Sequence, residues 1–219
     1  MDEPGQRSRD ARVRMVAFQL RTRNITDELV LRAMGAVPRE AFVGPDLARL
    51  AYDDRPLPIG GGQTISQPYI VARMTELLDV GFGHRVLDVG TGSGYQAAVL
   101  AELGCRVTSV ERDPTLAEEA RGRLARLGYG DRVMVEVGDG SLGWPDGAPW
   151  DGILVASAAP RIPDPLRDQL GDGRRLVIPV GSRREQELLV VTRRDDEFRV
   201  DVDGPCVFVP LVGAAGWGS

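Results

Sequence analysis

The sequence predicts an α/β domain with a largely parallel sheet, and three patterns indicate it. Short apolar runs alternate with stretches of helical periodicity in the second half of the chain. A glycine-rich turn joins the first of these runs to the helical stretch that follows, and a charged turn joins the last two runs. Alternating strands and helices form a parallel sheet with helices on both faces. The closing pair of runs indicates an antiparallel hairpin at one edge.

The first part of the chain is expected to be helical after a short tail. Residues 1–11 are polar and charged, which is typical of a flexible tail. Apolar side chains recur at helical spacing over residues 12–20, and Thr26 is a suitable N-cap for a second helix that runs to about Met34. Residues 41–68 are rich in proline and glycine, so we expect a long connecting segment with little regular structure there, which often carries function.

The remaining elements follow from apolar periodicity. A helix is expected after Pro68, because the apolar residues up to Leu78 fall on one helical face. The expected strands are residues 85–89, 106–111, 133–137, 152–156, 175–179, 187–192 and 206–211, with helices at about 95–103, 115–127 and 163–170. We therefore expect one domain over residues 12–213, with helices and the long loop in 12–80, the sheet in 81–213, and a tail at 214–219.

Composition excludes several classes of protein. A chain of 219 residues fits one α/β domain with a modest extension. Its net charge of −5 provides no positive field for nucleic acid or anionic membranes. We find neither a membrane span nor a secretory signal in the sequence. Cys105 and Cys206 lie far apart in apolar segments, so we expect two free thiols in a cytoplasmic protein.

The most informative motif is the turn with glycines at positions 90, 92 and 94, which follows an apolar strand containing Asp88. Glycine lets the backbone bend tightly and approach a ligand, and the start of a helix favours anionic groups. Dinucleotide-binding enzymes instead show G-x-G-x-x-G after an uninterrupted apolar strand. The spacing and the embedded acid favour the cationic cofactor S-adenosylmethionine. Its expected binding residues in this motif are Asp88, Gly90, Thr91, Gly92 and Ser93.

Two further acidic residues follow the next two strands. Glu111 ends the second strand, 21 positions after Gly90, where a carboxylate can accept hydrogen bonds from ribose hydroxyls. Asp139 follows the third strand and can meet the exocyclic amine of adenine, although Asp-Gly is also an ordinary turn. Ligands bind at the carboxyl ends of parallel strands. We therefore expect Glu111, Asp139 and Gly140 to complete the cofactor site.

The residues that other catalytic classes need are isolated in this sequence. His84 is the single histidine, and the two cysteines are far apart, so we expect no metal site of the zinc type. A catalytic serine elbow, G-x-S-x-G, does not occur. Methyl transfer to a carboxylate needs no general base, because the acid is already ionised at neutral pH. The pattern favours a carboxylate acceptor, with an exposed Asp or Glu acting as a base as the alternative.

The chain resembles the protein-L-isoaspartate O-methyltransferases over almost its whole length, from about Met15 to Gly213. The most specific match is the string Gly62-Gln63-Thr64-Ile65-Ser66-Gln67-Pro68-Tyr69. Other matches are residues 37–43, 56–60, 86–96, 138–144, 176–181 and 208–211. The resemblance implies a Rossmann-like S-adenosylmethionine-dependent methyltransferase fold. It also implies methylation of the α-carboxylate of L-isoaspartyl residues in damaged proteins and peptides, which initiates repair through a succinimide.

Carried over residue by residue, the resemblance makes Ser66 the active-site hydroxyl. It assigns Thr64, Ile65, Ser66 and Gln67 to substrate binding, and Gln63 and Thr64 to cofactor binding. A serine hydroxyl can orient one carboxylate oxygen, whereas the alternative is that Thr64 and Ser66 cap the helix after Pro68. The expected partners are isoaspartyl proteins and peptides, and we expect a monomer that binds neither nucleic acid nor membrane.

Three residues depart from the family pattern. Gly61 stands where a larger residue is frequent, Ser157 where alanine is common, and Val207 where many bacterial relatives have arginine. These changes leave open the methylation of a specific aspartate in a biosynthetic peptide by the same chemistry. A non-catalytic cofactor-binding module is disfavoured by the retained Thr64-Ile65-Ser66. A nicotinamide-dependent oxidoreductase is disfavoured by the glycine spacing.

Overall fold

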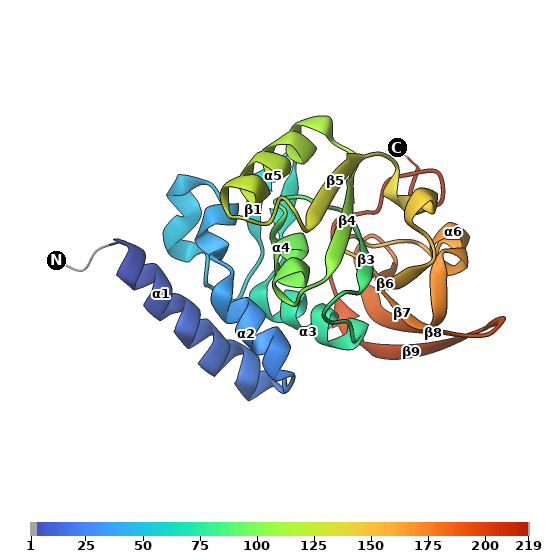
Figure 1. Ribbon diagram of the computed structural model, residues 1–219, viewed down its shortest axis with the longest axis horizontal. Coiled ribbons are helices and arrows are strands. Elements are labelled where there is room, and N and C mark those ends of the chain that lie inside the picture. The colour runs from blue at the N-terminus through green and yellow to red at the C-terminus, as the bar shows by residue number, and fades with distance from the viewer. Residues whose placement is uncertain (1–3, 219) are drawn as a thin grey trace.

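A seven-stranded sheet with the order β5-β4-β3-β6-β7-β8-β9 organises the chain in the computed structural model, which describes residues 4–218 (Figure 1). Its strands are β3 (Arg85–Val89), β4 (Arg106–Glu111), β5 (Val133–Val137), β6 (Trp150–Val155), β7 (Leu170–Gly181), β8 (Gln186–Arg194) and β9 (Glu197–Cys206). Neighbouring strands among β5, β4, β3, β6 and β7 pair in parallel. Strand β8 pairs antiparallel with β7 on one side and with β9 on the other. The expected fold class is confirmed, including its antiparallel C-terminal hairpin.

Helices cover both faces of this sheet. In Figure 1, α2 (Glu28–Ala36), α3 (Pro68–Leu78) and α4 (Tyr95–Glu102) lie on one side and α6 (Asp164–Asp168) on the other, with α5 (Pro114–Arg126) between β4 and β5 in the chain. Successive strand residues feed two separate cores: Val86 packs with the N-terminal helices and Leu87 with the residues around α6. Strands of a parallel sheet are buried on both faces in this way.

The N-terminal segment is more regular than the sequence indicates. Helix α1 (Pro4–Arg14) occupies most of the expected tail, whose residues 1–3 lie outside the described part of the chain. The helix continues as a π-helix, Met15–Leu20, in which Met15 and Leu20 are fully buried. The N-cap of α2 is Asp27 and not Thr26, because the Asp27 carboxylate accepts hydrogen bonds from the N–H groups of Leu29 and Val30.

The long connecting segment contains regular structure that the sequence analysis did not expect. Two 3₁₀ turns, Arg39–Phe42 and Pro45–Leu50, precede an antiparallel hairpin of β1 (Leu57–Gly60) and β2 (Gln63–Ile65). Gly61 lies in the hairpin turn with a φ of +56°, a conformation that favours glycine. A Cβ atom there would lie 3.4 Å from the Asp113 carboxylate. The hairpin therefore packs closely against the start of α5.

The C-terminal boundaries also differ from expectation. The last strand is β9 and not residues 206–211, because residues 197–206 pair with β8, whereas Pro210 forms an isolated bridge with Ala158. Strand β7 begins at Leu170, so α6 is shorter than the expected helix at 163–170. The segment after residue 213 packs on the domain as well, since the Ala214 N–H donates to the Asp139 carboxylate and the Trp217 indole to the Ala158 carbonyl.

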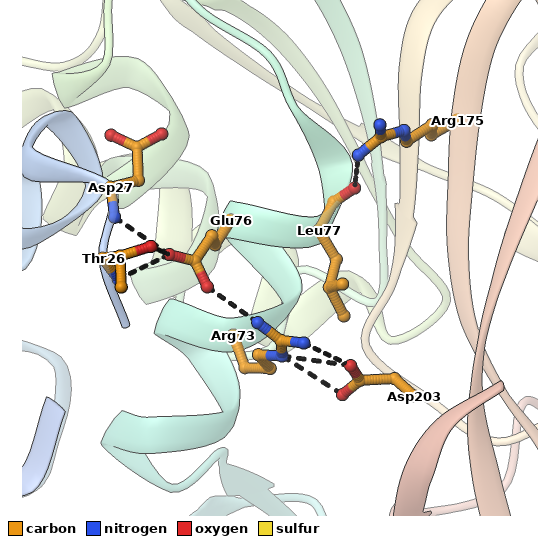
Figure 2. A network of polar contacts seen from close by, with 7 residues as sticks. All are labelled: Thr26, Asp27, Arg73, Glu76, Leu77, Arg175 and Asp203. Carbon is orange, nitrogen blue, oxygen red and sulfur yellow. Dashed lines mark hydrogen bonds and ion pairs between the residues drawn. The ribbon is translucent and has the colours of Figure 1, made fainter. Parts of the chain in front are cut away.

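Helix α3 is held in place by the polar network in Figure 2. Arg73 donates to Glu76 at 2.8 Å within the helix and to both oxygens of Asp203 on β9. The other Glu76 oxygen accepts the backbone N–H groups of Thr26 and Asp27, at 2.7 and 2.9 Å. Burial raises the pKa of Glu76, but these hydrogen bonds and Arg73 lower it overall. The network therefore fixes α3 against the start of α2 and against β9.

Candidate active site

A cavity of about 480 Å³ lies at the carboxyl ends of β3 and β4, where ligands bind in open α/β sheets. The turn after β3, the loop between β2 and α3, and a C-terminal segment contribute to its walls. The expected site residues that line it are Gln63, Thr64, Ile65, Ser66, Gly90, Thr91, Gly92, Ser93, Glu111 and Gly140. Three other expected residues, Gln67, Asp88 and Asp139, lie outside this lining.

The glycine turn forms the floor of the cavity. Gly90, Gly92 and Gly94 have φ values of +95°, +50° and +89°, which other residues rarely adopt. The N–H groups of Gly90 and Thr91 both donate to the Val110 carbonyl of β4. A Cβ atom on Gly92 would lie 3.3 Å from the Ile59 side chain of β1. Glycine therefore keeps the turn tight and leaves room beside it.

Glu111 lies at the end of β4 and binds this turn directly. One carboxylate oxygen accepts the Gly92 N–H at 2.8 Å, and the other accepts the N–H groups of Arg112 and Asp113 at 2.8 and 3.0 Å. A carboxylate offers about four acceptor positions. Three of them are used here, so an acceptor position is left for a ligand hydroxyl in the cavity.

Asp88 lies beneath the turn, and a chain of hydroxyls connects it to the cavity. Its Oδ2 accepts the Ser109 hydroxyl at 2.7 Å, and Ser109 is 2.6 Å from the hydroxyl of Thr91, which lines the cavity. Within residues 4–218, Asp88 Oδ1 has no hydrogen-bond partner. Burial raises the pKa of Asp88 to about 7, partly offset by the Ser109 hydrogen bond, and Glu111 raises it further. Ser109, which connects Asp88 to the turn, was not among the site residues expected from the sequence.

Asp139 binds protein groups with both of its oxygens. Oδ1 accepts the Ser141 N–H and hydroxyl at 3.0 and 2.6 Å, and Oδ2 accepts the Ala214 N–H at 2.7 Å. Its neighbour Gly140 does line the cavity, and a Cβ atom there would lie 2.6 Å from Val89. The structure therefore places Asp139 as an anchor for the C-terminal segment, beside the cavity.

Strand β2 and the loop that follows it bring two hydroxyl residues, Thr64 and Ser66, to the cavity. The Ser66 carbonyl accepts a hydrogen bond from the Arg39 guanidinium at 2.7 Å. Gln67 is the N-cap of α3 and, in the described chain, makes no side-chain capping bond; its amide donates instead to the Asp54 carbonyl at 3.0 Å. The alternative that Thr64 or Ser66 caps α3 is therefore not supported.

A smaller hollow of about 160 Å³ adjoins the cavity on the far side of this loop. The two share the residues Thr64, Ser66, Ala156 and Val209. The small hollow extends over Gln67, Tyr69 and Val207, and the Arg23 guanidinium stacks on the Tyr69 ring at 3.5 Å. Thr64 and Ser66 thus line both the large cavity and the small hollow.

The C-terminal wall of the cavity, formed by Val209–Val212, was not expected from the sequence. Ala158 holds this wall, because its N–H donates to the Val209 carbonyl and its carbonyl accepts the Leu211 N–H, both at 2.8 Å. Ser157, beside it, lines the cavity and is 6% exposed, and its oxygen has no hydrogen-bond partner in the described chain. The match at residues 208–211 was the available signal, but it carried no structural role.

Over residues 4–218, no group of three or more His, Cys, Asp or Glu side chains could hold a metal ion. The helices of this part of the chain are all too short or too polar to cross a membrane.

The cavity fits S-adenosylmethionine. Gly90 and Gly92 of the turn line it without Cβ atoms, and Glu111 offers an acceptor for a ribose hydroxyl. Thr64 and Ser66 also line the smaller hollow beside it. The fold and this site together define a methyltransferase that uses S-adenosylmethionine.

Comparisons with known proteins identify the family within this class. The family model for protein-L-isoaspartate(D-aspartate) O-methyltransferase matches residues 11–216. A protein-L-isoaspartate O-methyltransferase from Methanoculleus marisnigri is 55% identical over 209 residues, or 95% of this chain and 94% of the relative. The chain belongs to the protein-L-isoaspartate O-methyltransferase family.

Two solved structures share the fold. One, named protein-L-isoaspartate O-methyltransferase, has a TM-score of 0.83 and 28% identity over 94% of this chain and 67% of that chain. Another, from Plasmodium falciparum in complex with S-adenosyl-L-homocysteine, has a TM-score of 0.76 and 24% identity over 89% of this chain and 95% of that chain. The expected family, fold and cofactor are confirmed.

Proposed function

We infer that the protein methylates the α-carboxylate of L-isoaspartyl residues in proteins and peptides, which initiates repair through a succinimide. One observation carries the assignment of the site: Thr64 on β2 and Ser66 just after it line both the cofactor-sized cavity and the small hollow. A methyl donor in the first space and a peptide carboxylate in the second would meet at these hydroxyls. Holding two reactants in line accounts for much of such a rate enhancement.

The cofactor side of the site is assigned to the glycine turn, Glu111 and the hydroxyl chain beneath them. Bound S-adenosylmethionine supplies an electrophilic methyl group on a positively charged sulfur. Gly90, Thr91, Gly92 and Ser93 would contact its amino-acid end through the turn, and Glu111 its ribose. Asp88 would act through Ser109 and Thr91, which hold the turn from below. Gly140 would border the adenine, with Asp139 fixing the segment that follows.

The acceptor side is assigned to Thr64, Ile65, Ser66 and Gln67, whereas Gln63 and also Thr64 are assigned to the cofactor. A substrate carboxylate is ionised at neutral pH, so it requires no proton transfer to an enzymic base. The Ser66 hydroxyl would donate a hydrogen bond to one carboxylate oxygen, which leaves the other oxygen directed at the methyl group. The flanking peptide would lie over Tyr69 and Val207 in the small hollow.

The Ser66 assignment is tested with Ser66→Ala and a matched serine variant outside the cavity, Ser182→Ala. We expect Ser66→Ala to lose about 1–3 kcal/mol of transition-state stabilisation, or roughly 5- to 150-fold in single-turnover rate, with cofactor affinity retained. Ser182→Ala should keep the wild-type rate. A wild-type rate in Ser66→Ala would contradict the role, and lost cofactor binding would reassign Ser66 to the cofactor.

The alternative is a tailoring enzyme that methylates a specific aspartate in a biosynthetic peptide. The departure at Val207 motivates it, because this exposed residue lines the hollow assigned to the peptide. General repair predicts comparable kcat/KM over isoaspartyl peptides with varied flanking residues. Activity confined to one flanking sequence, or to normal aspartate, would favour the tailoring enzyme.

We further propose a monomer that works in the cytoplasm. The free thiols of Cys105 and Cys206 support a reducing compartment. Light scattering at working concentration tests the monomer, and fractionation of the source cells tests the location. A stable dimer or a secreted protein would contradict these proposals.

A further inference from the structure

Arg39 is a charged residue in the core whose position the methyl-transfer chemistry above does not explain. It has no exposed surface and is among the largest fully buried side chains of the protein. Burial lowers the pKa of its guanidinium, with smaller opposing effects from Tyr95 and other neighbours. Burying a cation is costly unless its hydrogen bonds are well made, so its contacts indicate what it is for.

The guanidinium binds two backbone carbonyls from distant segments. Its Nε donates to the Ala51 carbonyl at 2.6 Å, and its Nη2 donates to the Ser66 carbonyl at 2.7 Å. Nη1 has no hydrogen-bond partner in the part of the chain that the structure describes. An arginine has a planar fork of donors that can reach two acceptors at once, whereas a lysine ammonium is a single point.

The guanidinium also lies 4.8 Å from the centre of the Tyr95 ring, within the range of a cation–π contact. Tyr95 is the first residue of α4 and follows directly after Gly94 of the cofactor turn. Phe42, from the same 3₁₀ turn as Arg39, meets this ring edge-on at a centroid distance of 5.4 Å. The Arg39 side chain therefore contacts both the Ser66 backbone and Tyr95, the first residue of the helix that begins at the cofactor turn.

We propose that Arg39 is a positioning residue that fixes the backbone at Ser66 relative to the cofactor turn, so that the Ser66 hydroxyl faces the acceptor. This rests on the proposed function for the role of Ser66, but the positioning itself does not. Without Arg39 the Ser66 carbonyl loses its hydrogen-bond donor, and the loop between β2 and α3 loses its link through Arg39 to Tyr95 at the start of α4. A displacement of about 1 Å at reacting groups can reduce a rate by about a hundredfold.

The test uses Arg39→Met, which removes the donors, Arg39→Lys, which keeps the charge and one donor group, and Leu176→Ala as a control. Leu176 is fully buried in the core around α6, on the other face of the sheet. The first readout is amide hydrogen exchange in residues 63–67 of the folded protein with S-adenosylhomocysteine. We expect Arg39→Met to exchange about tenfold faster there, Arg39→Lys to be intermediate, and Leu176→Ala to match the wild type.

The second readout is a double-mutant cycle with Ser66→Ala, in single turnover at saturating peptide and cofactor. We expect Arg39→Met to slow methyl transfer by about 10- to 100-fold in the wild-type background, and to have little further effect when Ser66 is already alanine. If Arg39→Met fails to fold, the same cycle is run with Arg39→Lys.

The outcomes separate the two proposals. Unchanged exchange in residues 63–67, or equal acceleration in Leu176→Ala, would overturn the positioning role. Equal rate losses in both backgrounds would show that Arg39 does not act through Ser66 and would overturn it as well. If Arg39→Met exchanges faster but the wild-type protein fails to methylate isoaspartyl peptides, the positioning role is supported and the proposed function is contradicted.

Discussion

Replacing Glu111 by alanine tests the cofactor site at a residue whose carboxylate accepts three hydrogen bonds there. In the structure this carboxylate accepts the N–H groups of Gly92, Arg112 and Asp113, and an acceptor position is left toward the cavity. The substitution has two separate effects. It removes the acceptor for the ribose, and it leaves the Gly92 N–H of the turn without its partner.

The two effects differ in size and in ligand dependence. A hydrogen bond between a ribose hydroxyl and a charged carboxylate contributes about 1.5–3 kcal/mol, which is roughly 10- to 150-fold in Kd. Loosening the turn adds to this loss for any ligand that binds the turn. A ligand without ribose hydroxyls should therefore lose only the second part.

The assay is calorimetric titration of folded Glu111→Ala with S-adenosylhomocysteine and with its 2′,3′-dideoxy analogue. Glu118→Ala, an exposed carboxylate on α5, is the control and should bind both ligands like the wild type. We expect the loss of affinity to be about tenfold or more larger for the ligand with hydroxyls. Equal losses for both ligands, or unchanged affinity, would refute the ribose contact.

Three further predictions concern buried and polar groups. Burial raises the pKa of Asp88 from an ordinary value of 3.8 to about 7, so between these two pH values the folded protein holds a proton that the unfolded chain releases. The stability of the ligand-free protein should therefore fall as pH rises through this window. Urea midpoints of Asp88→Asn should lack that fall, and an unchanged pH dependence in this variant would contradict the assignment. Asp203→Asn should lower the free energy of unfolding by about 1 kcal/mol, because the pair with Arg73 in Figure 2 is only partly exposed, and a thermal melt identical to wild type would count against the network. Ser157→Ala should raise the melting temperature of the ligand-free protein, because it removes a buried hydroxyl without a partner; a lower melting temperature would show that the hydroxyl is satisfied.

The parallel strands could be predicted from sequence because each contains a short apolar run, which is buried on both faces in the central strands β3 and β6. The edge strand β9 was missed because its apolar residues Phe198, Val200 and Val202 alternate with charged residues and form no continuous apolar run. Helix α1 was missed for a related reason. Its side chains are mostly exposed and polar, so no apolar face marks it, and the Arg12 contact with the Ala36 carbonyl of α2 joins residues far apart in the chain.

The site was predictable where backbone conformation dictates residue type, as at Gly90 and Gly92. The acidic residues were harder to place, because a sequence shows a carboxylate but not its partners. Asp88 binds Ser109, and Asp139 binds Ser141 and Ala214. Neither carboxylate residue lines the cavity. The contact of Arg39 with Ser66 spans 27 positions and uses a backbone carbonyl, for which the sequence has no signal.

The most direct test of the account is methyl transfer to a matched pair of peptides that differ only in an isoaspartyl or a normal aspartyl linkage. Initial rates with labelled S-adenosylmethionine, followed by mass spectrometry of the product, measure both the preference and the position of the methyl group. We predict methylation of the isoaspartyl peptide at its α-carboxylate, followed by conversion to the succinimide, and little transfer to the aspartyl peptide. Equal transfer to both peptides, or transfer to the aspartyl peptide alone, would contradict it.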